Sequence, residues 1–292
     1  MSLFKGVATA LITPFKHGKV DLDALDALLE RQIAAGVAAV VVNGTTGEPS
    51  TMSHAERTKV ITRVIKQVNG RIKVIAGAGI NNTHTAIDYA KEAEQLGADA
   101  ILSVTPYYNK CTQKGLIAHY TEQAKHVNIP IILYNVPGRT GVNILPQTAK
   151  ELAEIDNIVA IKEASGNIDQ IIETARLNEG KMDIYSGDDG LVVPMMAAAG
   201  ALGVISVASN VFPELMVEMC NAYFNGKIKK ARDVQFKISP AVKALFAEVN
   251  PIPVKYAASI LGICENELRL PLTPMEKTEL IDKAFADLGL IK

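Results

Sequence analysis

A lysine near the end of a strongly apolar segment is the first residue that could carry covalent chemistry. Lys162 lies in the run IVAIKEA at 158–164. If this run is a β-strand, its side chains alternate between two faces, and Lys162 shares a face with Ile158 and Ala160. Burial would lower the pKa of the ammonium group, and the neutral amine could then attack a carbonyl carbon. A lysine that reaches solvent or pairs with a carboxylate is the alternative interpretation.

A tyrosine ends the apolar segment that comes just before that of Lys162. Tyr134 closes the run IILY at 131–134, and neighbouring parallel strands would bring the two side chains within reach of each other. A phenol can pass a proton to and from a carbinolamine, the alcohol that must lose water to become an imine. Alternatively, the ring fills a barrel mouth and its hydroxyl bonds a backbone carbonyl.

Two threonines flanked by glycines follow an earlier apolar segment, in the motif GTTGE at 44–48. The hydroxyls of Thr45 and Thr46, together with the backbone N–H groups of such a turn, suit an anionic carboxylate. A turn in which the threonines only cap the loop explains the same residues.

These residues belong to a pattern of eight apolar segments that recur at intervals of about 25 to 30 residues. The segments span 7–13, 38–43, 73–79, 100–104, 130–135, 158–164, 182–186 and 201–207. Helical patterns lie between them, so the strands must form a parallel sheet covered by helices. Eight units favour closure into a (β/α)8 TIM barrel over an open doubly wound sheet, and the class is α/β.

The strand and helix alternation stops after Val207, and the remaining segments are helical in pattern. We therefore predict a barrel over 1–225 and a C-terminal helical extension over 226–292, whose apolar stripes need a surface to cover. Active sites of TIM barrels lie at the carboxyl ends of the strands. Lys162 and Tyr134 lie near the ends of their segments, and Thr45 and Thr46 closely follow theirs.

Composition narrows the function classes. The 30 basic and 31 acidic residues give a net charge of −1, which provides no general attraction for nucleic acid or an anionic membrane. Three separated cysteines and five histidines without ligand spacing indicate neither disulfides nor a metal site, and no convincing cofactor motif occurs. We expect a cytoplasmic enzyme without cofactor. The uncharged stretch 190–213 is divided by proline and glycine, which favours a buried helix and strand over a membrane span.

Six motifs, in order, resemble those of the N-acetylneuraminate lyase superfamily of class I aldolases. They are GTTGE at 44–48, TPYYN at 105–109, YNVPGRTG at 134–141, IKEASGN at 161–167, GDD at 187–189 and GVISV at 203–207. The first and third resemble the dihydrodipicolinate synthase branch, and NPIPVK at 250–255 extends the match into the C-terminal helices. Ordered motifs over nearly the whole chain are far more specific than one motif alone.

The resemblance implies condensation of pyruvate with L-aspartate 4-semialdehyde, a step of lysine and diaminopimelate biosynthesis. Lys162 would form the imine with pyruvate, and Thr46 with Thr45 would anchor the pyruvate carboxylate. Tyr134, Thr45 and Tyr108 would form a proton relay, with Tyr108 contributed by the neighbouring subunit of a tight dimer.

Further roles follow from the same resemblance. Arg139 would bind the carboxylate of the semialdehyde as a charged donor, and the backbone near Gly187 and Ile205 would line the pocket. Two tight dimers would form a homotetramer. Two alternatives stay open: a sister aldolase that cleaves N-acetylneuraminate or a 2-keto-3-deoxy sugar acid, and a barrel that binds a keto acid without turnover. Arg139 within GRTG favours a short dicarboxylate-type partner over a polyol.

The sequence departs from the family pattern at a regulatory position. Lysine-inhibited members resemble this chain at His54 and Asn81, but they typically carry Ser, His and Glu where this chain has Pro49, Arg57 and Thr85. A site for an ammonium group would lose an acid at Thr85 and gain a cation at Arg57. We therefore expect weak or no feedback inhibition by L-lysine.

Overall fold

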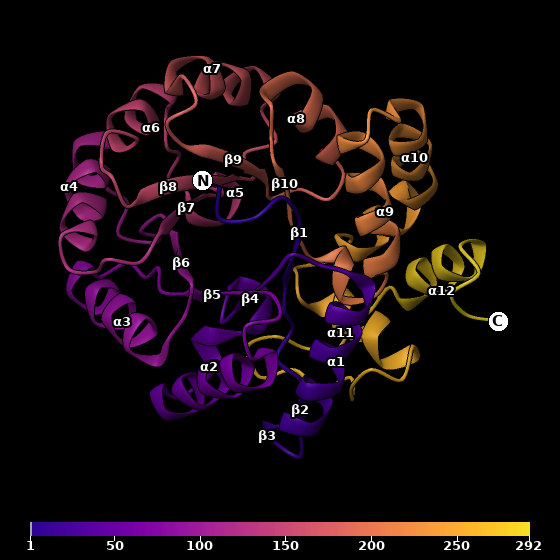
Figure 1. Ribbon diagram of the computed structural model, residues 1–292. Helices are drawn as coiled ribbons and strands as arrows, with labels where there is room; N and C mark the ends of the chain where they lie inside the picture. The colour runs from indigo at the N-terminus through magenta and orange to yellow at the C-terminus, as the bar shows by residue number, and fades with distance from the viewer. Residues whose placement is uncertain (1) are drawn as a thin grey trace. The chain divides into compact units, whose positions relative to one another are not determined.

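The computed structural model describes residues 2–292 and contains eight parallel strands in a closed barrel, with the order β1-β10-β9-β8-β7-β6-β5-β4 (Figure 1). The strands are β1 (Gly6–Ala10), β4 (Ala39–Val42), β5 (Lys73–Gly77), β6 (Ala100–Val104), β7 (Ile131–Asn135), β8 (Ile158–Glu163), β9 (Asp183–Ser186) and β10 (Gly203–Ser206). Each overlaps one of the eight predicted apolar segments. The predicted (β/α)8 TIM barrel is confirmed. A short antiparallel hairpin, β2 (Phe15–Lys16) and β3 (Lys19–Val20), is additional.

Helices follow the strands, as the pattern predicts. They are α1 (Leu22–Ala35), α2 (His54–Val68), α3 (Thr83–Leu96), α4 (Gln113–Ala124), α5 (Pro137–Thr140), α6 (Pro146–Leu152), α7 (Ile168–Asn178), α8 (Val192–Ala199), α9 (Pro213–Phe224), α10 (Ile228–Leu245), α11 (Ile252–Ile260) and α12 (Thr278–Asp287). Three 3-10 turns are η1 (Thr45–Gly47), η2 (Pro49–Thr51) and η3 (Ala208–Asn210). Local sequence sets their ends: Ser53 and Glu56 form a capping box that begins α2, and Gly36 ends α1 in the left-handed region.

Contacts divide the chain into two compact units. The first unit comprises the residues up to Lys5 and Lys73–Ile205, and the second comprises Gly6–Ile72 and Ser206–Lys292. All barrel strands precede residue 207, and four helices, α9 to α12, follow them. The predicted boundary near residue 225 stays a prediction.

In the first unit, β5 to β9 form consecutive parallel pairs. Figure 1 shows α3, α4, α6 and α7 on the outer side of these strands. The strands are buried because helices cover them, and Ile101, Ile132 and Ala160 have no exposed surface. The register sets Val104 beside Tyr134, and Tyr134 beside Lys162. The side chains at the ends of these neighbouring strands therefore lie side by side.

In the second unit, β1 pairs with β4, and helices α1, α2 and α9 to α12 surround their own apolar core. Phe212 and Phe285 meet edge to face with ring centroids 6.0 Å apart, and both are buried. The apolar stripe of α12 is therefore covered, as predicted for the C-terminal helices.

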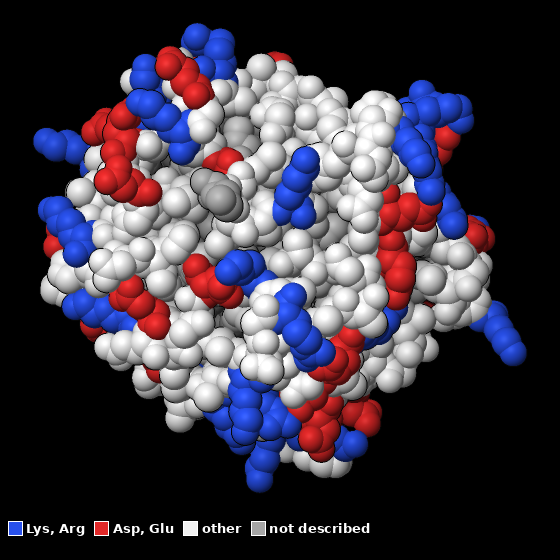
Figure 2. Space-filling view, viewed as in Figure 1, with Lys and Arg blue, Asp and Glu red and all other residues white. Residues whose placement is uncertain are grey.

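The uncharged stretch at 190–213 forms α8, β10 and η3, which confirms the predicted buried helix and strand. Within residues 2–292, no helix is both long and apolar enough to cross a membrane. On the face that Figure 2 shows, basic and acidic side chains are intermingled.

Candidate active site

Lys162 and Tyr134 are register partners on β8 and β7, as strand alternation and strand order predict. The Nζ atom of Lys162 lies 4.3 Å from the centroid of the Tyr134 ring. Both side chains are buried, with exposed fractions of 4% and 7%. The amine therefore faces an aromatic ring in an environment with little water, instead of reaching solvent.

Burial changes the proton affinity of both groups in opposite directions. The pKa of Lys162 falls to about 8, chiefly because the charged form is desolvated; Asp189 opposes this shift and Arg139 adds to it. Burial raises the pKa of Tyr134 to about 12, partly offset by the charge of Arg139. Near pH 8 about half of the Lys162 side chains would be neutral, whereas Tyr134 keeps its proton. The pair thus combines an amine that can act as a nucleophile with a phenol that can donate a proton.

Gly187 gives the Lys162 side chain its space. It directly follows β9, and a Cβ atom there would lie 3.0 Å from Cε of Lys162 and 2.8 Å from Cβ of Ala164. The N–H of Gly187 donates to the carbonyl of Glu163 at 2.8 Å, which fixes this close approach. Ile205 is fully buried in β10, where Val204 pairs with Ser186 of β9. Gly187, which the resemblance places in the pocket lining, therefore lies directly against the Lys162 side chain.

Arg139 lies on α5, the short helix that begins two residues after β7. It is exposed, and its charge influences the pKa of both Lys162 and Tyr134. A cation placed there can attract an anionic substrate toward the amine.

Tyr108 points away from its own chain. Its side chain is 92% exposed and its φ is 70°, in the left-handed region that a bulky residue seldom adopts. Asn81 fixes the loop: its Nδ2 donates to the Tyr107 carbonyl at 3.1 Å, and Asn109 Nδ2 donates to the Asn81 carbonyl at 2.9 Å. The ring is thus held outward.

Thr45 and Thr46 form η1 in the second unit. Thr46 is 3% exposed, and its Oγ1 accepts a hydrogen bond of 3.0 Å from Nδ2 of Asn250. Glu48 ends the turn in the left-handed region with φ 55°. Thr13 Oγ1 donates to the Gly47 carbonyl at 2.7 Å. The two threonines are therefore carried by a turn with fixed backbone geometry.

The model of the Dihydrodipicolinate synthetase family matches residues 3–286 of the sequence. The chain belongs to this family. The 4-hydroxy-tetrahydrodipicolinate synthase of Alkaliphilus oremlandii is 52% identical over 275 residues, which cover 94% of each chain. The solved dihydrodipicolinate synthase of Thermotoga maritima is 47% identical with a TM-score of 0.97, covering 99% of this chain and 100% of the other.

Membership of the Dihydrodipicolinate synthetase family confirms the predicted enzyme class, a lyase of the class I aldolase type. The relatives' names support the main functional prediction and give no support to the sister-aldolase alternative. A solved monomeric dihydrodipicolinate synthase variant is also similar, at 46% identity and a TM-score of 0.97, covering 99% of this chain and 98% of the other.

Two further buried polar residues, Asn135 and Glu163, were not predicted from the sequence. Asn135 and Glu163 are register partners one residue beyond Tyr134 and Lys162, so they occupy the opposite face. Asn135 Nδ2 donates to Glu163 Oε2 at 2.9 Å, and Ser165 N donates to Glu163 Oε1 at 2.7 Å. The sequence signal that could have identified them is a polar residue directly after Tyr134 and another directly after Lys162, each in an otherwise apolar strand. The network fixes the strand ends behind the site.

Asp189 is a further buried polar residue near Lys162, with 1% exposure, and its charge raises the pKa of the lysine. The side chain of Asp188 closes a turn, because its Oδ1 accepts a hydrogen bond from Gly190 N at 2.8 Å. Over residues 2–292, no group of three histidine, cysteine or acidic side chains is arranged to hold a metal.

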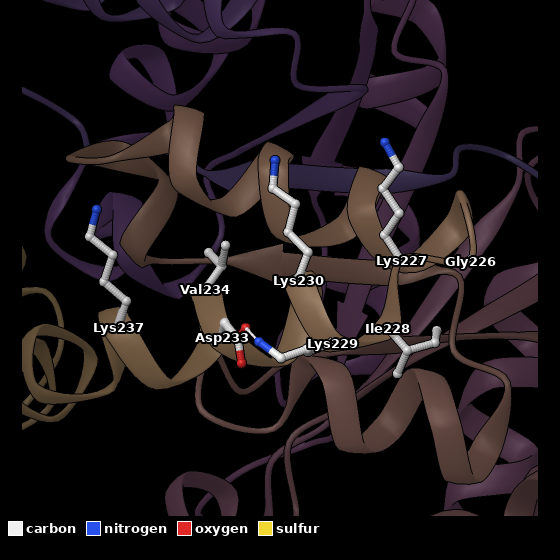
Figure 3. A pocket seen from close by; sticks show the side chains of 8 residues that line it. All are labelled: Gly226, Lys227, Ile228, Lys229, Lys230, Asp233, Val234 and Lys237. Atoms are coloured by element: carbon white, nitrogen blue, oxygen red, sulfur yellow. Dashed lines mark hydrogen bonds and ion pairs between the residues drawn. The ribbon is translucent and has the colours of Figure 1, made fainter.

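A separate basic hollow of about 560 Å³ lies on α10 in the second unit. Figure 3 shows Lys227, Lys230 and Lys237 extending to the same side, whereas Lys229 turns to Asp233 and lies 2.7 Å from its Oδ2. The residues that line this hollow include none of the predicted site residues.

Proposed function

We propose that this chain condenses pyruvate with L-aspartate 4-semialdehyde through an imine to Lys162. The observation that carries the proposal is the buried Lys162 amine, which has a pKa of about 8 and lies beside Tyr134. The relatives are 4-hydroxy-tetrahydrodipicolinate synthases, and this supports the same reaction.

The first half of the reaction forms the imine. The neutral Lys162 amine attacks the ketone carbon of pyruvate and yields a carbinolamine. Tyr134, whose raised pKa keeps it protonated, delivers a proton to the departing hydroxyl, and water leaves as the C=N bond forms. The threonine turn anchors the pyruvate carboxylate through the Thr46 hydroxyl and the backbone N–H groups of Thr45 and Thr46.

The second half uses the imine as an electron sink. The protonated imine acidifies the pyruvate methyl group, and loss of a proton gives an enamine, which attacks the aldehyde carbon of the semialdehyde. The amine of the product then attacks the imine carbon, closes the ring and releases Lys162. Arg139 binds the carboxylate of the semialdehyde during these steps, and the backbone at Gly187 and Ile205 lines the pocket.

The proton relay of this proposal joins two subunits. Tyr134, Thr45 and a neighbouring subunit's Tyr108 would carry protons between the reacting atoms and solvent. The 92% exposure of Tyr108 and its outward loop support a role outside its own chain. We propose a homotetramer of two tight dimers in the cytoplasm. Sedimentation velocity measures the subunit number directly.

Lysine-inhibited members of the family typically carry a histidine and an acid where this chain has the cation Arg57 and the neutral Thr85, and these replacements support weak or no inhibition by L-lysine. A ligand with an ammonium group needs a nearby hydrogen-bond acceptor that is negatively charged, such as a carboxylate. Initial rates with and without millimolar L-lysine should agree, and inhibition at sub-millimolar concentrations would overturn this part of the proposal.

Substrate competition tests the proposed reaction. Purified protein is supplied with pyruvate and either aspartate semialdehyde or N-acetylmannosamine, and pyruvate consumption is followed. We expect consumption only with the semialdehyde, and loss of that activity in Arg139→Gln by about tenfold or more, because a charged hydrogen bond is removed. Turnover with N-acetylmannosamine alone would replace the proposal by the sugar-acid lyase.

A further inference from the structure

The turn that carries Thr45 and Thr46 is held by a segment more than two hundred residues later in the chain. Asn250 Nδ2 donates to Thr46 Oγ1 at 3.0 Å, across a separation of 204 residues. Both side chains are buried, with exposed fractions of 7% and 3%. A hydroxyl has one hydrogen, and here the amide occupies an acceptor position of the oxygen. The Thr46 hydrogen is therefore left to donate to another group.

A buried ion pair fixes the far end of the same turn. Lys255 Nζ lies 2.6 Å from Glu48 Oε1, and the two side chains have 0% and 1% exposure. Lys255 also donates to the Glu267 carbonyl at 2.7 Å. Glu48 is the residue that ends the turn, so these contacts hold that end in place.

The ring of Phe15 contacts two cations, Lys255 and Arg269. The Lys255 Nζ atom lies 4.0 Å from the ring centroid, and the Arg269 guanidinium carbon lies 4.3 Å from it. Arg269 also bonds Glu56 Oε1 at 2.6 Å and the Thr51 carbonyl at 3.1 Å. Its backbone N–H donates to Glu48 Oε2 at 3.3 Å. The segment from Asn250 to Arg269 thus contacts the turn and the start of α2 at several points.

We propose that Asn250 is a positioning residue that directs the Thr46 hydroxyl toward the carboxylate of the keto acid, with the Lys255 and Glu48 pair holding the turn in place. The proposal rests on the proposed function of Thr46. Asn250 acts through Thr46 by occupying its acceptor position, so that the hydrogen is available to an anion. A buried ion pair is well suited to such a task, because its geometry is specific even where its net contribution to stability is small.

The test compares steady-state constants for pyruvate in three variants. Asn250→Ala removes the donor, and Asn250→Asp preserves the volume while offering a carboxylate that captures the Thr46 hydrogen and repels the substrate. We expect KM for pyruvate to rise about tenfold in Asn250→Ala and further in Asn250→Asp, with a smaller change in kcat. Asn221→Ala, on the exposed surface of α9, is the control and should leave both constants unchanged.

Coupling to Thr46 separates positioning from a general effect on folding. In a Thr46→Val background, Asn250→Ala should raise KM for pyruvate no further, because the hydroxyl that it directs is gone. Thermal unfolding checks that each variant is folded. If Thr46→Val raises KM and Asn250→Ala does not, or if the two effects multiply, the positioning role is wrong. If Thr46→Val itself leaves KM unchanged, the carboxylate anchor of the proposed function fails instead.

Discussion

Lys255 and Glu48 form an ion pair of 2.6 Å that is almost completely withdrawn from solvent. Removing one partner leaves an uncompensated buried charge, so Lys255→Met should lower the free energy of unfolding by about 3 to 5 kcal/mol. The double variant Lys255→Met with Glu48→Gln should recover most of that loss, because no isolated charge remains. Urea denaturation measures both values.

The exposed pair of Lys283 and Asp287, with Nζ and Oδ2 2.8 Å apart, supplies the control for this experiment. Lys283→Met should change the free energy of unfolding by about 1 kcal/mol or less. An effect of Lys255→Met no larger than that of Lys283→Met would show that the buried pair is unimportant for stability.

The pH dependence of imine formation should follow the Lys162 amine. Because the neutral amine attacks, the rate of imine formation should rise with pH through about 8 and level off above it. Arg139 lowers the pKa of Lys162, so Arg139→Gln should move this midpoint to higher pH. Asp189 raises it, so Asp189→Asn should move the midpoint to lower pH. Stopped-flow mixing with pyruvate over pH 6 to about 10 gives the midpoints; shifts in the reverse directions would contradict the assigned electrostatics.

Gly187 should tolerate no side chain, because its added Cβ would lie 2.8 Å from Ala164 Cβ and 3.0 Å from Lys162 Cε. We expect Gly187→Ala to displace the Lys162 side chain and reduce kcat about a hundredfold, as small misplacements in active sites do. Gly138→Ala is the matched control, since its added Cβ would meet nothing within 4 Å. Equal kcat values in the two variants would mean that the close approach at Gly187 is without consequence.

Mixing inactive chains tests whether a site is shared. Tyr108→Phe retains the amine, and Lys162→Ala retains the tyrosine that would enter the other subunit's site. If the subunits exchange, one site of each hybrid dimer is complete, and about a quarter of the wild-type activity should return. Mixed chains that remain inactive, although exchange is demonstrated by mass spectrometry, would place Tyr108 outside the relay.

The sequence was sufficient for the barrel and for the pair of Lys162 and Tyr134, because both depend on short-range rules. Strand alternation fixes the face of Lys162, and consecutive strands of a barrel lie side by side. The contact between Asn250 and Thr46 could not be predicted in this way, since no periodic pattern links residues 204 positions apart. Asn135 and Glu163 could not be predicted for another reason. Their side chains lie on the strand face that the apolar pattern assigns to packing, where burial of a polar group is unexpected. They are tolerated there because the Asn135 amide donates a hydrogen bond to the Glu163 carboxylate.

Covalent trapping shows whether Lys162 forms the imine with pyruvate. The protein is incubated with pyruvate and sodium borohydride, digested, and its peptides are mapped by mass spectrometry. We expect one stable adduct, on Lys162, in wild-type protein and none in Lys162→Ala, whereas the buried Lys255 stays unmodified in both. An adduct on another lysine, or none in wild-type protein, would contradict the imine mechanism.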